Sequence, residues 1–392
     1  MTPYTALAFA FRFHRSVRIT RLHIRDFRRL HDVDVRPGPG VNLLIGPNGA
    51  GKTSVLEAIH LMAYGRSFRG RVRDGLIRTG TGAVEVFVEW DDAGRERRAG
   101  LRHGGDRWEG RLDGASVDQL GDLCAALAVV SFEPGSHALV AGGGEPRRRF
   151  LDWGLFHVEH EFLPAWRRYA RALRQRNALL KAQRGDAELD GWEHEMAVAG
   201  ETMTRLRAGY VDTLQAALAD VVPVIAPSLG AAGMEFVAGW KRADLSLRDA
   251  LLISRERDRL SGHTTVGPHR ADWRVHVAAT PQGEALSRGQ AKLVALACLL
   301  AQAQDLAGRQ GQWPIVVLDD LASELDAHHR ERALGLLAAT RAQVFVSGTD
   351  LQPLASAAAA GATVFHVEQG SLIPDGPAGP GASGAAVPPK ML

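Results

Sequence analysis

Cysteine is nearly absent from this sequence: the 392 residues contain only two, Cys124 and Cys298. Two thiols so far apart exclude a disulfide framework and the closely spaced cysteine pairs of a zinc site. Their scarcity favours a reducing compartment, so we expect a cytoplasmic protein.

Long apolar runs are also missing, although 45% of the residues are hydrophobic. No run reaches the roughly 18–20 apolar residues of a membrane-spanning helix. The apolar stretch near the start of the chain is interrupted by Arg12 and has no basic region before it, which argues against a secretory signal. An acid-free start is compatible with a transit peptide, but we favour an extension before the first strand. We expect no membrane partner.

Neither sign of charge dominates, since the formal net charge is +3, and aromatic residues make up only 6% of the chain. A nucleic-acid site must therefore be a local patch. Residues 66–78 contain five arginines and one acidic residue, and residues 166–184 contain seven basic residues and no acidic one. Such segments can neutralise phosphates, and the shortage of aromatics favours contact with the duplex backbone over base stacking. A solvated basic helix face is the alternative.

What is present is an alternation of short strands and helices. Residues 17–45 predict strand, turn and strand, and apolar spacing from Thr53 predicts a helix. Residues 83–90, 97–103 and 107–114 predict an antiparallel layer beside the loop at 46–53. Further strands and helices follow from residue 234 to residue 368. This pattern predicts an α/β fold with a helical insertion.

The insertion begins near Pro146. Apolar residues at helical spacing predict one face over residues 151–162, and a second series is close to a heptad seam: Trp192, Met196, Ala199, Met203, Leu206, Tyr210 and Leu214. With a turn at 184–191, residues 146–222 are expected to form mainly two long packed helices, although an ordinary helical subdomain gives the same pattern. The expected divisions are an extension at 1–16, a first domain part at 17–145, a helical arm at 146–260, a second part at 261–370 and a disordered tail at 371–392.

The sequence GPNGAGKT at 46–53 has the spacing of a phosphate-binding loop, between a predicted strand and a predicted helix. Its backbone N–H groups can surround phosphate oxygens, and the helix N-terminus adds positive potential. The predicted nucleotide ligands are Gly46, Pro47, Asn48, Gly49, Ala50, Gly51, Lys52 and Thr53. Lys52 is expected to bridge the β- and γ-phosphates and Thr53 to ligate Mg²⁺.

The second motif is PIVVLDDLASELD at 314–326. A buried strand over 315–318 ends in two carboxylates, of which Asp319 is expected to support Mg²⁺ and Asp320 to activate the attacking water. A strand ending in two aspartates also suits a solvated turn, but its position more than 200 residues after a phosphate loop favours the site.

The third motif is LSRGQAK at 286–292. Ser287 can cap the helix that follows, and a serine and a glycine at a helix start can bind an anion. A plain capped helix explains this motif equally well when it is taken alone.

Together, the order of these motifs resembles the head ATPases of the ATP-binding-cassette type, and among them the SMC-like DNA-repair branch. Seven blocks narrow the resemblance to the RecF family of bacterial recombination mediators: ITRLHIRDFRRL, GPNGAGKTSVLEAI, GRSFRG, PRRRFLDWGLF, VGPHRADW, LSRGQAK and LDDLASELD. They span residue 19 to about residue 326. Departures from the family pattern fall at Gly135, Ser136, Phe68 and Ala291.

The resemblance implies an α/β ATPase head with an inserted helical, short coiled-coil-like arm domain, and ATP and Mg²⁺ as cofactors. Ser287, Arg288, Gly289 and Gln290 would contact the ATP of a second copy, with Ser287 taking part in catalysis with Lys52 and Asp320. Ser323, Glu324 and Asp326 would line the dimer interface, and Ser347 and Thr349 would sense the γ-phosphate.

The implied function is slow Mg²⁺-dependent ATP hydrolysis by a homodimer that ATP holds together. The dimer would clamp duplex DNA near single-strand gaps and act with RecR and RecO to load RecA. The alternatives are an ATPase subunit of a transporter or membrane complex and a clamp that binds ATP without hydrolysis; a small-molecule kinase is less favoured.

Overall fold

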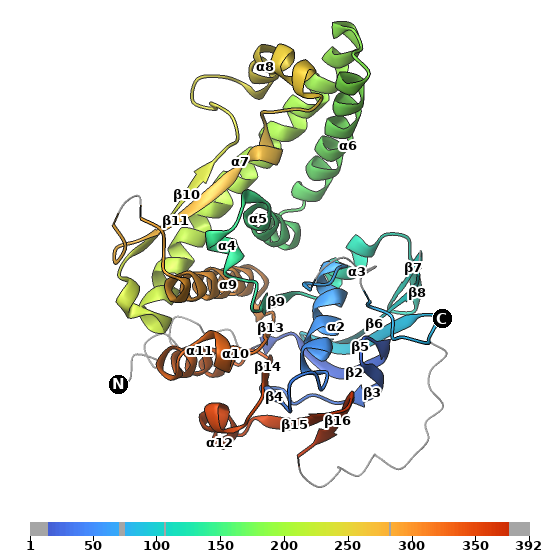
Figure 1. The fold of residues 1–392 in the computed structure, drawn as a ribbon, viewed down its shortest axis with the longest axis vertical. Helices are drawn as coiled ribbons and strands as arrows, with labels where there is room; N and C mark the ends of the chain where they lie inside the picture. Colours follow the sequence, from blue (N-terminus) through green and yellow to red (C-terminus); the bar gives the residue numbers. More distant parts are fainter. Residues whose placement is uncertain (1–14, 70–74, 106, 282–283, 376–392) are drawn as a thin grey trace. The chain divides into compact units, whose positions relative to one another are not determined.

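The computed structural model describes residues 15–69, 75–105, 107–281 and 284–375. The chain divides into two compact units (Figure 1). Unit 1 combines the residues up to 136 with those from 306 onward, and unit 2 contains residues 137–305. Unit 2 is therefore inserted between the two parts of unit 1.

Unit 1 contains a six-stranded sheet in the order β16-β15-β4-β14-β13-β9. Its strands are β4 (Val41–Ile45), β9 (Val129–Phe132), β13 (Ile315–Leu318), β14 (Val344–Gly348), β15 (Thr363–Glu368) and β16 (Ser371–Pro374). All neighbours are parallel except β15 and β16. Because β4 lies between β14 and β15, the strand before the glycine loop is completed only by strands from the end of the chain.

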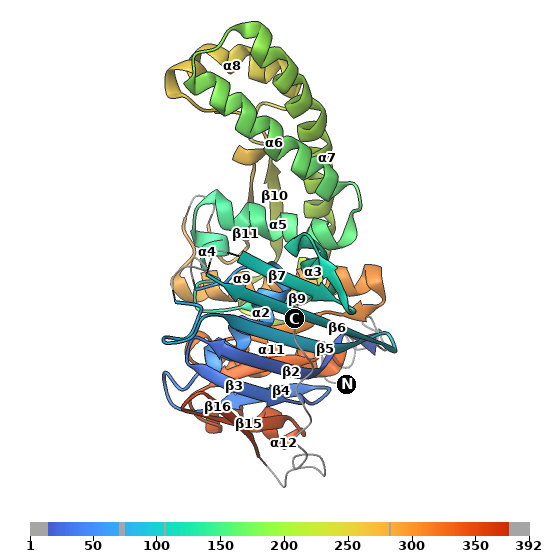
Figure 2. The ribbon, with the colours of Figure 1, turned by 90° about the vertical axis from the view of Figure 1, so that its right-hand side faces the viewer.

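A second six-stranded sheet is antiparallel, in the order β3-β2-β5-β6-β7-β8 (Figure 2). Its strands are β2 (Arg18–Phe27), β3 (Leu30–Val35), β5 (Val84–Asp92), β6 (Arg95–Gly104), β7 (Arg107–Leu112) and β8 (Ala115–Val117). Alternating burial along β5 matches its alternating sequence. The predicted antiparallel layer is confirmed, and β3 and β8 extend it.

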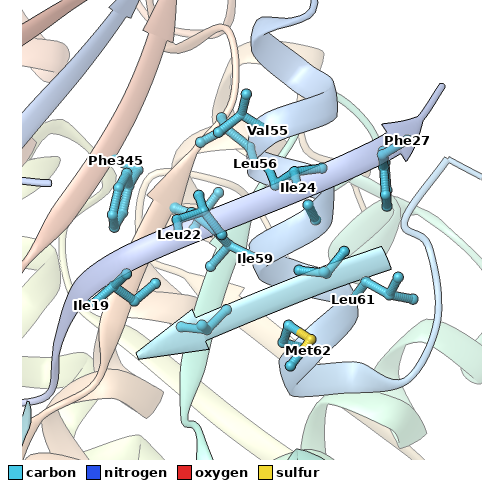
Figure 3. Packing of buried hydrophobic residues seen from close by; sticks show 14 of the residues in the cluster. Ile19, Leu22, Ile24, Phe27, Val55, Leu56, Ile59, Leu61, Met62 and Phe345 are labelled. Carbon is cyan, nitrogen blue, oxygen red and sulfur yellow. The ribbon is translucent and has the colours of Figure 1, made fainter. Parts of the chain in front are cut away.

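Helix α2 (Lys52–Tyr64) supplies the core that the two sheets share. It contacts β2 of the antiparallel sheet and β9, β13 and β14 of the parallel sheet. Figure 3 shows Val55, Leu56 and Ile59 of α2 packed beside Leu22 and Ile24 of β2. Almost every residue of α2 is buried, because the helix is apolar around most of its circumference.

Shorter elements complete unit 1. They are β1 (Arg15–Ser16), β12 (Gln312–Trp313), α3 (Leu120–Ala126), α10 (Leu321–Glu324), α11 (Ala327–Thr340), η3 (Gln352–Leu354) and α12 (Ala355–Ala359). Strand β1 pairs with β12, so the expected extension at 1–16 ends earlier than predicted. Strand β16 likewise lies inside the segment expected to be a tail. Residues 1–14 and 376–392 lie outside the described residues.

Unit 2 contains most of the helices. They are α4 (Ala138–Ala141), α5 (Gly144–Val158), α6 (Phe162–Lys181), α7 (Asp186–Ile225), η1 (Pro227–Leu229), α8 (Leu247–Ser261), η2 (Pro268–Arg270) and the start of α9 (Arg288–Gln310). Helices α6 and α7 run side by side and form the arm hairpin (Figures 1 and 2). The seam predicted on α7 is buried from Met196 to Leu214.

Three details of the arm differ from the sequence predictions. The expected face over 151–162 is broken, because α5 ends at Val158 and α6 begins at Phe162. The predicted turn at 184–191 is mostly the first turns of α7, which begins at Asp186. Among the described residues, strands β10 (Ala232–Val237) and β11 (Asp272–Val277) form a separate two-stranded antiparallel sheet within unit 2.

Among the residues that the structure describes, two helices, α7 and α9, are long and apolar enough to cross a membrane by length and composition. Within the most apolar window of α9, 78% is buried inside the structure, and the corresponding share of α7 is 50%. Packing in the core accounts for the apolar character of α9.

Candidate nucleotide-binding site

The glycine loop connects β4 to α2 and is hydrogen-bonded to two later segments of unit 1, at Gly348 and Gly370. The Gly46 N–H group donates to the Gly348 carbonyl at 3.3 Å, and the Gly370 N–H group donates to the Ala50 carbonyl at 2.9 Å. Gly49 and Gly51 have φ angles of 79° and 120°, which favour glycine over residues with a Cβ. The loop therefore lies between a strand and a helix, with glycines at the two positions where the backbone favours them.

Lys52 begins α2 and reaches back over the loop. Its Nζ donates to the carbonyls of Gly46 at 2.6 Å and Pro47 at 2.9 Å. Burial lowers the pKa of Lys52 from its usual value, and the carboxylates of Asp320 and Asp319 oppose that shift. Phosphate oxygens are acceptors of the kind that Lys52 now finds in backbone carbonyls, and they add negative charge.

Thr53 and Asp319 meet although they are 266 positions apart. The Thr53 Oγ1 donates to Asp319 Oδ1 at 3.0 Å, and the Ser347 Oγ donates to the same oxygen at 2.6 Å. Burial raises the pKa of Asp319, and these two hydrogen bonds counteract part of the shift. A buried carboxylate beside a hydroxyl is a donor set that suits Mg²⁺, which prefers oxygen ligands.

The described residues contain no group of three or more His, Cys, Asp or Glu side chains that could hold a metal. Mg²⁺ usually binds one or two carboxylates and takes its remaining ligands from water and substrate phosphates. Thr53 and Asp319 fit that arrangement, with the nucleotide supplying further oxygens.

Asp320 follows at the end of β13 with a left-handed backbone, φ 51°. Its N–H group donates to Ser347 Oγ at 2.8 Å, and its Oδ1 accepts from Ser323 Oγ at 2.9 Å. Ser347 therefore contacts both aspartates and fixes the turn between them. Left-handed backbone is uncommon outside glycine, and Asp is among the residues that tolerate it.

These side chains line one cleft of about 820 Å³ in unit 1. Among the residues around it are Asn48, Gly49, Gly51, Lys52, Thr53, Asp319, Asp320 and Ser347. Of the predicted γ-phosphate sensors, Ser347 is in this lining, whereas Thr349 is exposed and donates to Asp350.

Several lining residues were not predicted from the sequence. Arg29 Nη1 donates to the Gly49 carbonyl at 3.0 Å and joins the antiparallel sheet to the loop. Arg28 makes two hydrogen bonds, of 2.6 and 2.7 Å, to the fully buried Glu57 on α2. The adjacent arginines between two strands were the available signal, but only the chain reversal at Arg28, with φ 54°, directs them to the loop.

Glu57 also organises the segment after α2. Ser67 Oγ donates to Glu57 Oε1, and the Arg69 N–H group donates to Ser67 Oγ at 2.9 Å. Phe68 and Arg69 both line the cleft, as do Glu133 and Pro134. The departure from the family pattern at Phe68 therefore lies at the site. Arg71 and Arg73 of the basic segment are outside the described residues.

The residues of the third motif, LSRGQAK, belong to unit 2 and lie at the start of α9. Ser287 Oγ accepts from the Gln290 N–H group at 3.2 Å, and Gln290 Oε1 accepts from the Ser287 N–H group at 2.9 Å. This reciprocal pair is a capping box. Ser287, Arg288 and Gly289 are exposed, and a Cβ at Gly289 would meet no atom within 4 Å.

The residues expected at a dimer interface lie around α10 in unit 1. Ser323 is exposed and hydrogen-bonded to Asp320. Asp326 caps α11, where its Oδ1 accepts from the His329 N–H group at 3.0 Å. Asp326 thus has a role in the fold of the single chain whatever else it contacts.

Comparison with known proteins begins with the family model described as the RecF/RecN/SMC N terminal domain, which matches residues 18–372. A "DNA replication and repair protein RecF" of Xanthomonas oryzae pv. oryzae is 59% identical over 359 residues, covering 90% of this chain and 99% of that protein. The chain belongs to the RecF family. The RecF of Stenotrophomonas maltophilia is 58% identical, with 91% of this chain and 99% of that protein covered, and the RecF of Edwardsiella ictaluri is 38% identical, with 90% and 99% covered.

Solved structures agree with the RecF head fold. The structure of a recombination mediator protein, RecF-ATP in the RecFOR pathway, has a TM-score of 0.81 at 23% identity, covering 92% of this chain and 98% of that chain. An SMC head bound to the C-winged helix domain of ScpA has a TM-score of 0.55 at 15% identity, with 91% and 96% covered. The predicted α/β head with an inserted helical arm is confirmed.

Proposed function

We propose that this RecF family member binds ATP and Mg²⁺ in the cleft of unit 1 and hydrolyses ATP slowly. The observation that carries the proposal is the meeting of Thr53 and Asp319 beside Lys52 and the glycine loop. Bound Mg²⁺ would neutralise charge that develops on the phosphates. The RecF-ATP structural relative supports the choice of nucleotide.

Different residues of the site would bind the nucleotide, hold Mg²⁺ and activate water. Lys52 would exchange its carbonyl partners for phosphate oxygens, and the loop N–H groups would hold the β-phosphate. Asp320 would orient a water molecule and accept its proton as the water oxygen bonds to the γ-phosphorus and the bond to ADP breaks. Thr53 and Asp319 would hold Mg²⁺.

The finer function continues from the family. ATP would hold two copies together, with Ser287, Arg288 and Gly289 of one copy on the nucleotide of the other. Their exposure in the single chain is compatible with that role. In the cytoplasm, the dimer would bind duplex DNA near single-strand gaps. RecO and RecR would assist it in loading RecA. The place of the RecF-ATP structural relative in the RecFOR pathway supports these partners.

The test combines hydrolysis, sedimentation and duplex-DNA binding, each with ATP and Mg²⁺, with ADP, and without nucleotide. We expect dimerisation and DNA binding to require ATP, and Lys52→Ala to lose all three. Asp320→Asn should keep ATP-dependent dimerisation while hydrolysis falls by about 100-fold or more. Hydrolysis that survives in Lys52→Ala would overturn the proposed site, and dimerisation without DNA binding would overturn the proposed partner.

A further inference from the structure

A second pocket lies on the arm hairpin, wholly within unit 2. It has a volume of about 460 Å³ and is formed between α6 and α7. Its lining consists of Arg167, Arg168, Arg171, Ala172, Trp192 and Glu195. None of these residues takes part in the nucleotide site, so any ligand of this pocket has a function beyond the proposed ATP chemistry.

The pocket combines an apolar surface with cations. Trp192 begins the α7 seam, but it is only half-buried, whereas the next seam residue, Met196, is fully buried. Part of the Trp192 side chain therefore remains available in the pocket, whereas Ala172 is buried beneath it. The aliphatic stems of Arg167 and Arg171 extend this apolar surface, and their guanidinium groups can stay in solvent.

The charges around the pocket are unequal. Glu195 is the single acidic residue in the lining, and Arg168 already holds it with two hydrogen bonds of 2.6 and 2.9 Å. Arg167 and Arg171 are exposed and make no ion pair among the residues that the structure describes. A ligand that enters the pocket thus meets two exposed arginines, of which Arg171 also interacts electrostatically with Glu195.

Ion pairs within the protein also lower the number of cations that the basic segment at 166–184 can offer to a ligand. Arg176 is completely buried between Glu193 and Asp258, and Arg184 pairs with Glu188. Four cations without an ion pair in the described part of the chain then remain, Arg167, Arg171, Arg174 and Lys181. Their spacings of four, three and seven place them along one face of α6. Only the first two line the pocket.

We propose that this pocket binds an acidic peptide segment of a partner protein that carries one large apolar side chain. Carboxylates of the peptide pair with Arg167 and Arg171, and the apolar side chain packs against Trp192 and the aliphatic stems of the two arginines. A sugar-phosphate backbone supplies the charge but no apolar group for a pocket of this volume, so the apolar lining favours a peptide over duplex DNA. Aromatic and arginine side chains are the residues that most often dominate binding energy at protein interfaces.

The test measures the fluorescence anisotropy of labelled short peptides with the full-length chain. The probe is a peptide rich in aspartate with a single central phenylalanine, and its matched control has serine in place of phenylalanine. We expect saturable binding of the probe that weakens with salt, and binding of the serine control that is weaker by about ten-fold. Absence of probe binding at millimolar peptide would overturn the proposal, and so would equal binding of the two peptides.

Variants separate the pocket from the charged face. Arg171→Glu should weaken peptide binding by about ten-fold or more. Arg174→Glu is the matched control, because it reverses a charge on the same helix face outside the pocket, and it should leave peptide affinity within about two-fold. Trp192→Ala should weaken the phenylalanine peptide and leave the serine peptide unchanged.

A labelled DNA duplex, measured with ATP and Mg²⁺, provides the remaining comparison. If α6 binds phosphates rather than a peptide, Arg171→Glu and Arg174→Glu will weaken duplex binding to the same extent. Both variants will then leave peptide binding almost unchanged, and the peptide proposal fails. Thermal unfolding of each variant controls for folding. Since the peptide assay contains no nucleotide, its failure is distinct from failure of the proposed ATP site.

Discussion

Asp319 is a residue that suits the nucleotide site but lowers the stability of the nucleotide-free fold. Its carboxylate is buried, burial raises its pKa, and it accepts hydrogen bonds from Thr53 and Ser347. Neighbouring Asp320 adds a like charge. Two carboxylates held at one strand end are costly until a cation is present, which is typical of functional sites.

Asp319→Asn is therefore expected to stabilise the nucleotide-free protein. The amide oxygen can accept the same two hydrogen bonds, and removal of the buried charge should raise the free energy of unfolding by about 1 kcal/mol at pH 7. The same variant should lose Mg²⁺-dependent hydrolysis. Denaturant unfolding measures the first effect, with Asp320→Asn, which is only half-buried, as a control that changes less. A less stable Asp319→Asn protein would contradict the argument.

For single residues, the sequence predicts those that belong to a motif. It misses those that reach the site only through the tertiary fold. The glycine loop and the two aspartates are recognisable because their backbone context is local. Arg29 and Glu57 are not, because their roles depend on a turn of the antiparallel sheet that contacts the loop. Glu57 looks like an ordinary helix residue in the sequence, yet it is buried and pairs with Arg28.

Among the elements, the arm hairpin depends on charges that were predicted to face solvent. Arg176 joins three helices: it pairs with Glu193 of α7 and Asp258 of α8, at 2.9 and 2.8 Å. The sequence does contain the signal, since Tyr169, Ala172, Arg176 and Leu180 form the buried face of α6. Counting Arg176 with the surface cations was wrong for that reason.

Replacing Arg176 by methionine should destabilise unit 2 strongly. The change leaves Glu193 and Asp258 buried without their shared partner, which typically costs about 3–5 kcal/mol. Arg174→Met, on the exposed face of the same helix, should change the free energy of unfolding by no more than about 0.5 kcal/mol. Urea unfolding followed by circular dichroism compares the two, and similar curves for both variants would show that the network contributes little.

A second element-scale prediction concerns η2, where His269 is half-buried. Its Nε2 donates to the Thr264 carbonyl at 3.0 Å, so its Nδ1 accepts from the Tyr169 hydroxyl at 2.7 Å. Burial lowers the pKa of His269 to about 4; the Thr264 carbonyl and Asp258 oppose the shift, while Arg270 and Arg148 add to it. The unfolded chain takes up this proton near pH 6.5, so protons favour the unfolded state between these values.

Stability should consequently fall as the pH is lowered from 7 to 5. For His269 alone the expected loss is about 1–2 kcal/mol, and His269→Gln should show a smaller loss across the same interval. The measurement is the free energy of unfolding at the two pH values for both proteins. His157, whose pKa burial also lowers to about 4, contributes equally to both and cancels. An unchanged pH dependence in His269→Gln would exclude this histidine as a cause.

On the scale of the whole molecule, the sequence predicts which domains are present better than it predicts where they begin and end. The insertion of a helical domain into an α/β head was predictable from the change in periodicity near Pro146. Its limits were not: unit 2 runs from 137 to 305, because β10 and β11 join each other and Gln302 and Gln304 of α9 bond to α5 and α7. Tertiary hydrogen bonds of this kind leave no pattern in the sequence.

The exposed start of α9 gives a prediction about assembly that follows from the proposed function. Gly289 has open space around it, so Gly289→Phe should leave the stability of the single chain within about 0.5 kcal/mol. If a second copy covers this residue when ATP binds, the bulky ring should abolish nucleotide-dependent dimerisation in sedimentation experiments. Gly289→Ala serves as the control with a small side chain. Normal dimerisation of Gly289→Phe would exclude Gly289 from the interface.

The position of β4 has a consequence for the order of folding during synthesis. The strands of the antiparallel sheet are complete by residue 117, and unit 2 by residue 305. Strand β4 must wait for β14 and β15, which end at residues 348 and 368. A nascent chain can thus form its earliest sheet and its arm while the ribosome is still at work. The glycine loop gains its last supports only near the final residues, so a prematurely terminated chain cannot form a complete nucleotide site.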